Sequence, residues 1–180
     1  ILAGDYAPDA VAATTSPSMD IQVASNFERV LFEASGRDAG ALAGLMQNFA
    51  RDGRFTIPPP WRARVAGDFA AARADEAEVA AMMARIHRER AILIDPHTAV
   101  GLVAAKKLRK EGRLAGRVIA LATAHPAKFP DAVEAATGVH PALPPRLAAM
   151  MRAPERCEKA PAGVDAIRAL ILDRSAFAER

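Results

Sequence analysis

The chain has 180 residues, a formal net charge of +3 and a single cysteine, Cys157. Its 24 basic residues are scattered among 21 acidic ones and do not form a basic stripe, and only 5% of the residues are aromatic, which argues against a nucleic-acid-binding surface. One cysteine excludes an internal disulfide, and no apolar run reaches the length of about 18 residues that a membrane span needs. These features predict a cytoplasmic protein with neither a nucleic-acid nor a membrane partner.

The first predicted helix follows a polar turn. Residues 14–20 contain three consecutive hydroxyl residues, a proline, another serine and an acid, which is typical of a turn that ends in a helix N-cap, here Ser18. Apolar residues then recur at helical spacing as far as Ala34, and Gly36 provides a stop. The sequence therefore predicts a helix between Ser18 and Gly36 with one apolar face.

Two more helices are predicted in the first half of the chain. The second starts near Asp38 and ends at Gly53, and the short link favours an antiparallel pair with the first. Pro58–Pro60 cannot lie inside a helix and are expected to mark a surface boundary. The third helix starts near Asp75 and carries its apolar residues on one face.

Two short apolar runs predict buried parallel strands. Residues 91–94 and 118–122 are wholly apolar, which is typical of strands covered on both faces. Between them, Asp95 as N-cap and Pro96 at the first helical position predict a helix that Gly112 ends. A strand, a helix and a strand in this order form a unit with parallel strands and a right-handed crossover. The fold class predicted is α/β, helix-rich with a few parallel strands.

Hydroxyl and imidazole groups follow both predicted strands. The first loop carries His97 and Thr98, and the second carries Thr123 and His125. Ligands bind at the carboxyl ends of parallel strands in open α/β sheets, so both loops are candidate site segments. Such groups orient a ligand without being charged, which suits a site whose covalent chemistry belongs to a cofactor. Capping of a helix and pinning of a loop explain these residues equally well.

Other site motifs are missing from the sequence. The four histidines form no pair four residues apart and there is no paired-cysteine ligand set, so no metal is expected. No spaced-glycine pattern for a nucleotide and no Gly-x-Ser-x-Gly turn occurs. Hydrolytic chemistry is therefore only weakly supported.

Four motifs, in their order and spacing, resemble the carboxyl-terminal portion of threonine synthases of the longer, bacterial and fungal type. They are Ser16–Ile21, Ser25–Arg29, Asp95–Gly101 and Ala122–Phe129, and the resemblance covers most of residues 4–150. It implies a pyridoxal-phosphate (PLP) lyase of threonine biosynthesis with the tryptophan-synthase-β-like, fold-type II architecture. Such an enzyme converts O-phospho-L-homoserine and water to L-threonine and phosphate.

The resemblance also implies roles for individual residues. Thr123 matches the hydroxyl that meets the pyridine nitrogen of the cofactor, and His125 is expected beside the cofactor. The candidates for the substrate side are His97, Thr98, Ser18, Asn26 and Arg29. The lysine that holds PLP as a Schiff base lies upstream in the family, so no catalytic residue is expected in this chain. Lys128 sits in a different motif and receives no catalytic role.

The chain opens at Ile1 without a methionine, and the family's Schiff-base lysine lies upstream of the matched motifs. We therefore expect a piece of a longer enzyme. Residues 1–153 are expected to be an incomplete carboxyl-terminal part of the catalytic region, and residues 154–180 a loop and helix. Such a chain is expected to be inactive alone and to self-associate through apolar surface left exposed. Two alternatives stay open: another fold-type II PLP lyase or dehydratase, and a non-catalytic helical interaction module.

Overall fold

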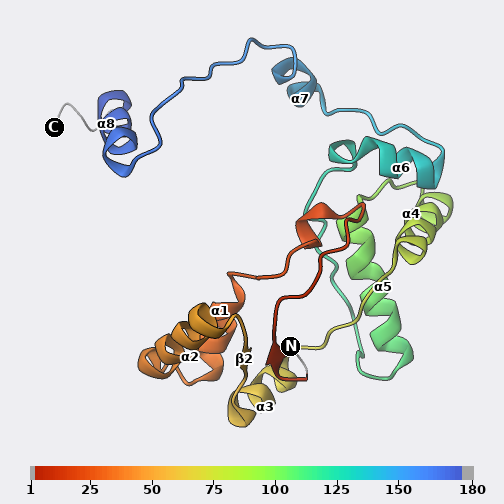
Figure 1. Ribbon diagram of the computed structural model, residues 1–180. Coiled ribbons are helices and arrows are strands. Elements are labelled where there is room, and N and C mark those ends of the chain that lie inside the picture. The colour runs from red at the N-terminus through yellow and green to blue at the C-terminus, as the bar shows by residue number, and fades with distance from the viewer. Residues whose placement is uncertain (1–2, 176–180) are drawn as a thin grey trace. The chain divides into compact units, whose positions relative to one another are not determined.

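The computed structural model describes residues 3–175 of the chain. It divides into two compact units, Ile1–Ala142 and Leu143–Arg180. The first unit contains helices α1 to α6 and both strands of the described residues, and the second contains helices α7 and α8 (Figure 1). The division predicted from sequence at residue 153 stays a prediction, and residues 176–180 of the expected carboxyl-terminal segment lie outside the described residues.

Three helices and a two-stranded sheet form the first packed group of the first unit. Their bounds are α1 (Phe27–Ala34), α2 (Ala39–Asp52), α3 (Pro59–Asp68), β1 (Asp5–Tyr6) and β2 (Phe55–Thr56). The strands pair antiparallel, with Tyr6 opposite Phe55. Helix α1 packs against both α2 and α3, and β2 packs against α2 (Figure 1).

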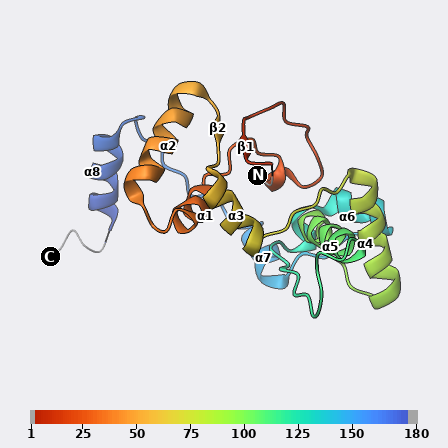
Figure 2. The same cartoon turned by 90° about the horizontal axis from the view of Figure 1, so that it is seen from below.

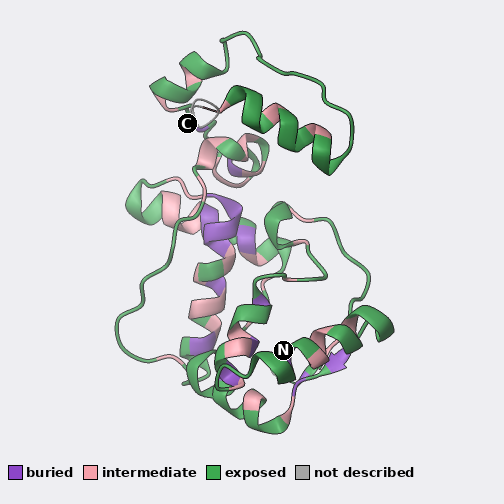
Figure 3. Cartoon of the chain, turned by 90° about the vertical axis from the view of Figure 1, so that its left-hand side faces the viewer, coloured by how far each residue is buried: buried purple, intermediate pink, exposed green. Residues whose placement is uncertain are grey.

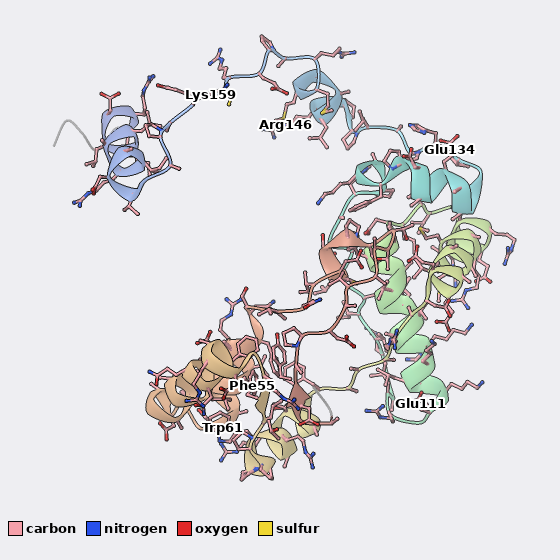
Figure 4. All side chains as sticks on the ribbon, viewed as in Figure 1. Phe55, Trp61, Glu111, Glu134, Arg146 and Lys159 are labelled. Atoms are coloured by element: carbon pink, nitrogen blue, oxygen red, sulfur yellow. The ribbon has the colours of Figure 1, made fainter. Side chains whose placement is uncertain are left out.

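Aromatic side chains fill the core of this group. The Tyr6 ring stacks on the Phe55 ring with 4.8 Å between the ring centroids, and Phe49 meets Phe55 edge-on at 5.5 Å. Trp61 of α3 packs against the same cluster, and Figure 4 shows Phe55 and Trp61 extending from β2 and α3. Because offset and edge-on pairs add to the burial of apolar area, this small group holds together around its rings.

The sequence predicted α2 closely and the start of α1 poorly. Helix α2 begins after Asp38, whose carboxylate accepts the Ala41 amide at 2.9 Å, and ends at Gly53, which has a left-handed φ of 67°. The predicted cap at Ser18 is wrong, because Ser18 lies inside a separate 3-10 helix, η1 (Pro17–Met19). Helix α1 starts only at Phe27. A helix at Pro59 was not predicted, although proline is tolerated in a first turn.

Helices α4 (Glu76–Arg90), α5 (Pro96–Lys110) and α6 (Pro130–Thr137) form the second packed group. Helix α4 packs against both α5 and α6, and Figure 2 shows the three helices together. The buried core residues are Val79, Met82, Met83, Ala99, Val103 and Val133. The predicted helix starts at Asp75 and Asp95 are confirmed, because each of these residues caps its helix, and Gly138 ends α6 with a left-handed φ of 72°.

The parallel strands predicted at residues 91–94 and 118–122 are absent, and both segments are irregular. The only strands among residues 3–175 are the antiparallel β1 and β2. Ile119 is 83% exposed and Leu121 is 76% exposed, the opposite of the burial predicted for a central strand. A strand forms only when a neighbour takes its hydrogen bonds, and the described residues offer no neighbour to either run. The described residues are therefore helix-rich, as predicted, but their two strands are antiparallel and the predicted parallel strands are missing.

The second unit contains helices α7 (Pro145–Met150) and α8 (Val164–Arg174). The helix expected within residues 154–180 is thus confirmed as α8. Its apolar side chains are uncovered within the described residues: Val164 is 84% exposed and Ile171 59%. Figure 3 shows these helices in the colours of exposed and half-buried residues. No helix between residues 3 and 175 combines the length and the apolar character of a membrane span.

Candidate functional site

A buried carboxylate organises the start of α5. Asp95 is fully buried, and its Oδ1 atom accepts the backbone N–H groups of His97 at 2.9 Å and Thr98 at 3.4 Å. The Thr98 hydroxyl donates to the other carboxylate oxygen of Asp95. A buried charge requires such partners, and the positive end of the helix dipole also favours an anion here. The Asp-Pro start that predicted a helix cap therefore also builds a buried polar cluster.

The His97 side chain is held at both ring nitrogens. Its Nδ1 atom lies 3.0 Å from Oδ1 of Asp95, and its Nε2 atom lies 3.2 Å from the backbone nitrogen of Ser18. A backbone N–H can only donate, so Nε2 is the acceptor and the ring proton sits on Nδ1, where it is donated to Asp95. The carboxylate therefore selects the neutral tautomer that can receive the Ser18 amide.

The turn that contains Ser18 is closed by its own side chains. The Asp20 carboxylate accepts the backbone N–H and the hydroxyl of Thr14, each at 2.7 Å. Ser16 is buried, and its hydroxyl lies 3.1 Å from the Thr14 hydroxyl. The Thr15 amide donates to Glu76 at the start of α4 at 3.1 Å. The turn is thus fixed internally and attached to the second packed group at two points.

The second predicted site loop reaches the same histidine. The 3-10 helix η2 (Pro126–Lys128) is capped by His125, whose Nδ1 atom accepts the Ala127 amide at 3.2 Å. Phe129 follows directly, and its ring centroid lies 4.6 Å from that of His97. Thr123 lies in irregular, exposed chain before this turn. The structure therefore brings the two loops together at His97 and Phe129 without the strands that were expected to do so.

Two predicted site residues lie elsewhere. Asn26 precedes α1 and Arg29 lies within it, both exposed, and neither side chain hydrogen-bonds to the His97 cluster within the described residues. Arg29 lines a groove of about 790 Å³ between α1 and α3, together with Arg64 and Phe69. The structure thus separates these two residues from Ser18, His97 and Thr98, which it brings together.

The order aspartate, histidine, serine suggests a catalytic triad, but the geometry is different. In a triad the histidine accepts the serine hydroxyl proton, whereas Nε2 of His97 accepts the Ser18 backbone N–H. The cluster therefore contains no activated nucleophile and can bind and orient a ligand. Residues 3–175 contain no group of three or more His, Cys, Asp or Glu side chains placed to hold a metal ion.

Sequence reasoning missed three contributors to this cluster. Asp95 was predicted as a helix cap in a candidate site loop, but its contact with the His97 ring was not predicted, although an aspartate two residues before a histidine can reach the ring. Asp20 and Phe129 were not predicted to contribute. Asp20 bonds across six positions, a pattern that Thr14 and Asp20 in one polar turn could have suggested. The contact of Phe129 with His97 depends on tertiary folding and leaves no local signal.

Comparison with known proteins agrees with the motifs. Residues 98–171 match the family model described as "Threonine synthase, C-terminal". The threonine synthase of Pseudomonas aeruginosa is 36% identical over 92% of this chain and 35% of its own length. That of Corynebacterium glutamicum is 39% identical over 94% of this chain and 36% of its own length.

Solved structures give the same result. A crystal structure of PLP-bound threonine synthase from Brucella melitensis matches 84% of this chain and 32% of its own chain, with a TM-score of 0.76 and 47% identity. Yeast threonine synthase matches 98% of this chain and 39% of its own, with a TM-score of 0.75 and 28% identity. The chain is thus a helix-rich segment that is related to part of a larger enzyme fold.

The particular relationship is more specific. The chain is homologous to threonine synthases and corresponds to their carboxyl-terminal region, which confirms the resemblance inferred from the four motifs. The chain spans about a third of the length of the curated relatives it matches.

Proposed function

We propose that this chain supplies the carboxyl-terminal part of a cytoplasmic threonine synthase site. In the complete enzyme that site would use PLP to convert O-phospho-L-homoserine and water to L-threonine and phosphate. The observation that carries the proposal is the meeting of the two motif loops, with the His97 ring 4.6 Å from the Phe129 ring. Homology to threonine synthases over most of the chain supports the same activity.

The residues present fit one side of the cofactor. Thr123 has an exposed, neutral hydroxyl that can bond to a pyridine nitrogen without forcing its protonation. His125 accepts an amide at Nδ1, so its neutral ring carries the proton on Nε2 and can donate to an oxygen of a bound ligand. When bound, PLP supplies an electron sink for the reaction. Thr123 and His125 would hold the cofactor, and the other motif loop, residues 95–98, would face the substrate.

The exposed apolar run supports a site completed by other residues. Ile119 and Leu121 lie just before Thr123 and are mostly exposed, although their sequence pattern is that of a buried strand. We propose that the rest of the enzyme covers this run and so fixes the position of Thr123. Left uncovered, the run would promote self-association of the chain. The chain is accordingly proposed to have no turnover by itself.

A turnover assay tests this function. Release of threonine and phosphate from O-phospho-L-homoserine with added PLP is expected for a full-length enzyme that contains this chain, and no release is expected for the 180-residue chain. Turnover by the chain alone would contradict the proposed division of the site. Preference of the full-length enzyme for an unphosphorylated hydroxyamino acid would favour the dehydratase alternative, and no turnover of either substrate would favour the interaction module.

Substitution of Thr123 tests the proposed cofactor contact. Thr123→Val removes the hydroxyl at constant shape and is expected to lower kcat by about 10- to 100-fold, because one hydrogen bond to a polar or charged partner is lost. Thr123→Ser keeps the hydroxyl and is the matched control, with kcat close to that of the parent. The PLP absorption spectrum should shift in the valine variant only. Equal kcat values for the two variants would remove Thr123 from the cofactor site.

A further inference from the structure

We propose that His97 is a positioning residue, which holds the Ser16–Asp20 turn through the Ser18 amide and so presents the Ser18 hydroxyl to an oxygen of the phosphorylated amino-acid substrate. This inference rests on the proposed function for the identity of the ligand. The hydrogen-bond arrangement itself can be tested without any turnover.

Both nitrogens of His97 are engaged, which leaves none for a substrate. Nδ1 donates to Asp95 at 3.0 Å and Nε2 accepts the Ser18 amide at 3.2 Å. The ring is only 6% exposed, so water cannot readily replace either partner. Asp95 is fully buried and is itself held by the N-terminus of α5. The contact with Asp95 therefore sets the tautomer of His97, and the contact of His97 with the Ser18 amide then sets the position of the turn.

The turn that carries Ser18 is rigid enough for the His97 contact to fix all of it. Two 2.7 Å hydrogen bonds between Thr14 and Asp20 close it internally, and Ser16 is buried within it. Because the turn is closed, fixing one of its amides fixes the whole of it. The contact joins residues 79 positions apart in the sequence, so it is a tertiary constraint and not a local turn preference.

The Ser18 side chain is the free polar group of this arrangement. The residue is exposed, and its hydroxyl has no hydrogen-bond partner within residues 3–175, whereas the Thr98 hydroxyl is already donated to Asp95. The Phe129 ring, adjacent to η2, lies against the His97 ring of the same cluster, with 4.6 Å between the ring centroids. A hydroxyl held here can donate to a carboxylate or phosphate oxygen of a substrate bound between the two loops.

The hydrogen bond can be observed directly in the 15N-labelled 180-residue chain. A scalar coupling between the Ser18 amide nitrogen and Nε2 of His97 is expected, together with slow exchange of the Ser18 amide proton. Both signals are expected to persist in Ser18→Ala, which keeps the amide, and to disappear in His97→Asn. Absence of the coupling in a folded parent chain would overturn the proposal whatever the enzyme's activity.

A matched pair of variants in the full-length enzyme separates positioning from proton transfer. Asn can imitate the Nδ1 donor of His97 but offers no acceptor to Ser18, whereas Gln can place an acceptor oxygen near the Nε2 position. We expect His97→Asn to raise KM about tenfold with a smaller change in kcat, and His97→Gln to recover most of the loss. His140→Asn, at an exposed histidine bonded only to Glu134, is the control with parent kinetics.

A double-mutant cycle connects the histidine to the hydroxyl. Ser18→Ala is expected to raise KM about as much as His97→Asn, and the double variant should be little worse than either single variant, because both act through one contact. Additive effects, or equal loss of kcat in His97→Gln and His97→Asn, would overturn the positioning role. If the enzyme turns over no phosphorylated substrate, the proposed function fails, while the Ser18 coupling still decides whether His97 holds the turn.

Discussion

The two loops that carry the candidate site differ in how far the chain builds them. Residues 95–98 are buried and fully hydrogen-bonded, with Asp95 as their common acceptor. Residues 118–123 are exposed and irregular, and Ile119 and Leu121 face no covering layer within the described residues. Residues 95–98 were predicted to follow a buried parallel strand, and residues 118–122 were predicted to form one. Only the first has a local anchor that does not depend on a sheet.

The difference shows what a helix N-cap can do without a sheet. The Asp95 carboxylate at the start of α5 has its donors supplied by His97 and Thr98, two and three residues further on, so the loop forms as soon as the helix does. A strand has no such local partner, because its backbone groups bond to another strand. The first loop is therefore fixed by residues of this chain, whereas the second is left exposed by the described residues.

The largest expected effect on the free energy of unfolding is that of Asp95→Ala, which removes the anchor of the first loop. The substitution leaves two amides, a hydroxyl and the His97 ring without their buried acceptor, so it should lower the free energy of unfolding by about 3 kcal/mol. Urea unfolding of the 180-residue chain measures the change. Asp9→Ala removes an exposed carboxylate bonded only to the neighbouring Ala10 amide and should change the value by less than about 0.5 kcal/mol. Similar values for the two variants would mean that Asp95 does not anchor the first loop.

A smaller effect on the free energy of unfolding is expected at the start of α4, where Glu76 accepts the Thr15 amide of the turn that carries Ser18. The Lys107 ammonium, 2.6 Å away, lowers the pKa of Glu78 below its usual 4.5, and the Asp75 amide adds to the effect. A lowered pKa stabilises the fold above the unfolded-state value, and that stability is lost as the pH falls through the folded-state value.

Unfolding measured between about pH 6 and about pH 3 should therefore show part of the acid-induced loss depending on Glu78. Glu78→Gln should flatten this dependence, and Lys107→Met should remove most of it by taking away the main cause. An unchanged pH profile in both variants would show that the ion pair does not contribute to folding.

The smallest effect is expected from serine substitutions in the exposed run. Ile119→Ser and Leu121→Ser remove apolar groups that are already in water, so the unfolding free energy of the chain should change by less than about 0.5 kcal/mol. Leu31→Ala, at a fully buried position, is the control and should cost about 3 kcal/mol. In the full-length enzyme the serine variants should become strongly destabilising. A small effect there as well would mean that the run stays uncovered.

Local rules predicted the ends of several helices well. Asp38, Asp75 and Asp95 cap α2, α4 and α5, and Gly53 ends α2 as expected. Each of these signals acts within one turn of helix, so the residues that decide the outcome are neighbours in the sequence. The family motifs were also readable from the sequence, because a match of several consecutive residues needs no folded partner.

Tertiary structure decided the strands and the site. The run at 118–122 has the composition of a buried strand, but composition cannot supply the neighbouring strand that makes one. Ser18 was predicted as a helix cap, yet its amide is held by His97, 79 positions away. Contacts of this range depend on which surfaces the folded helices bring together. The sequence by itself thus determined where α2, α4 and α5 begin, because their caps act locally, and only the packed structure decided which side chains share a site.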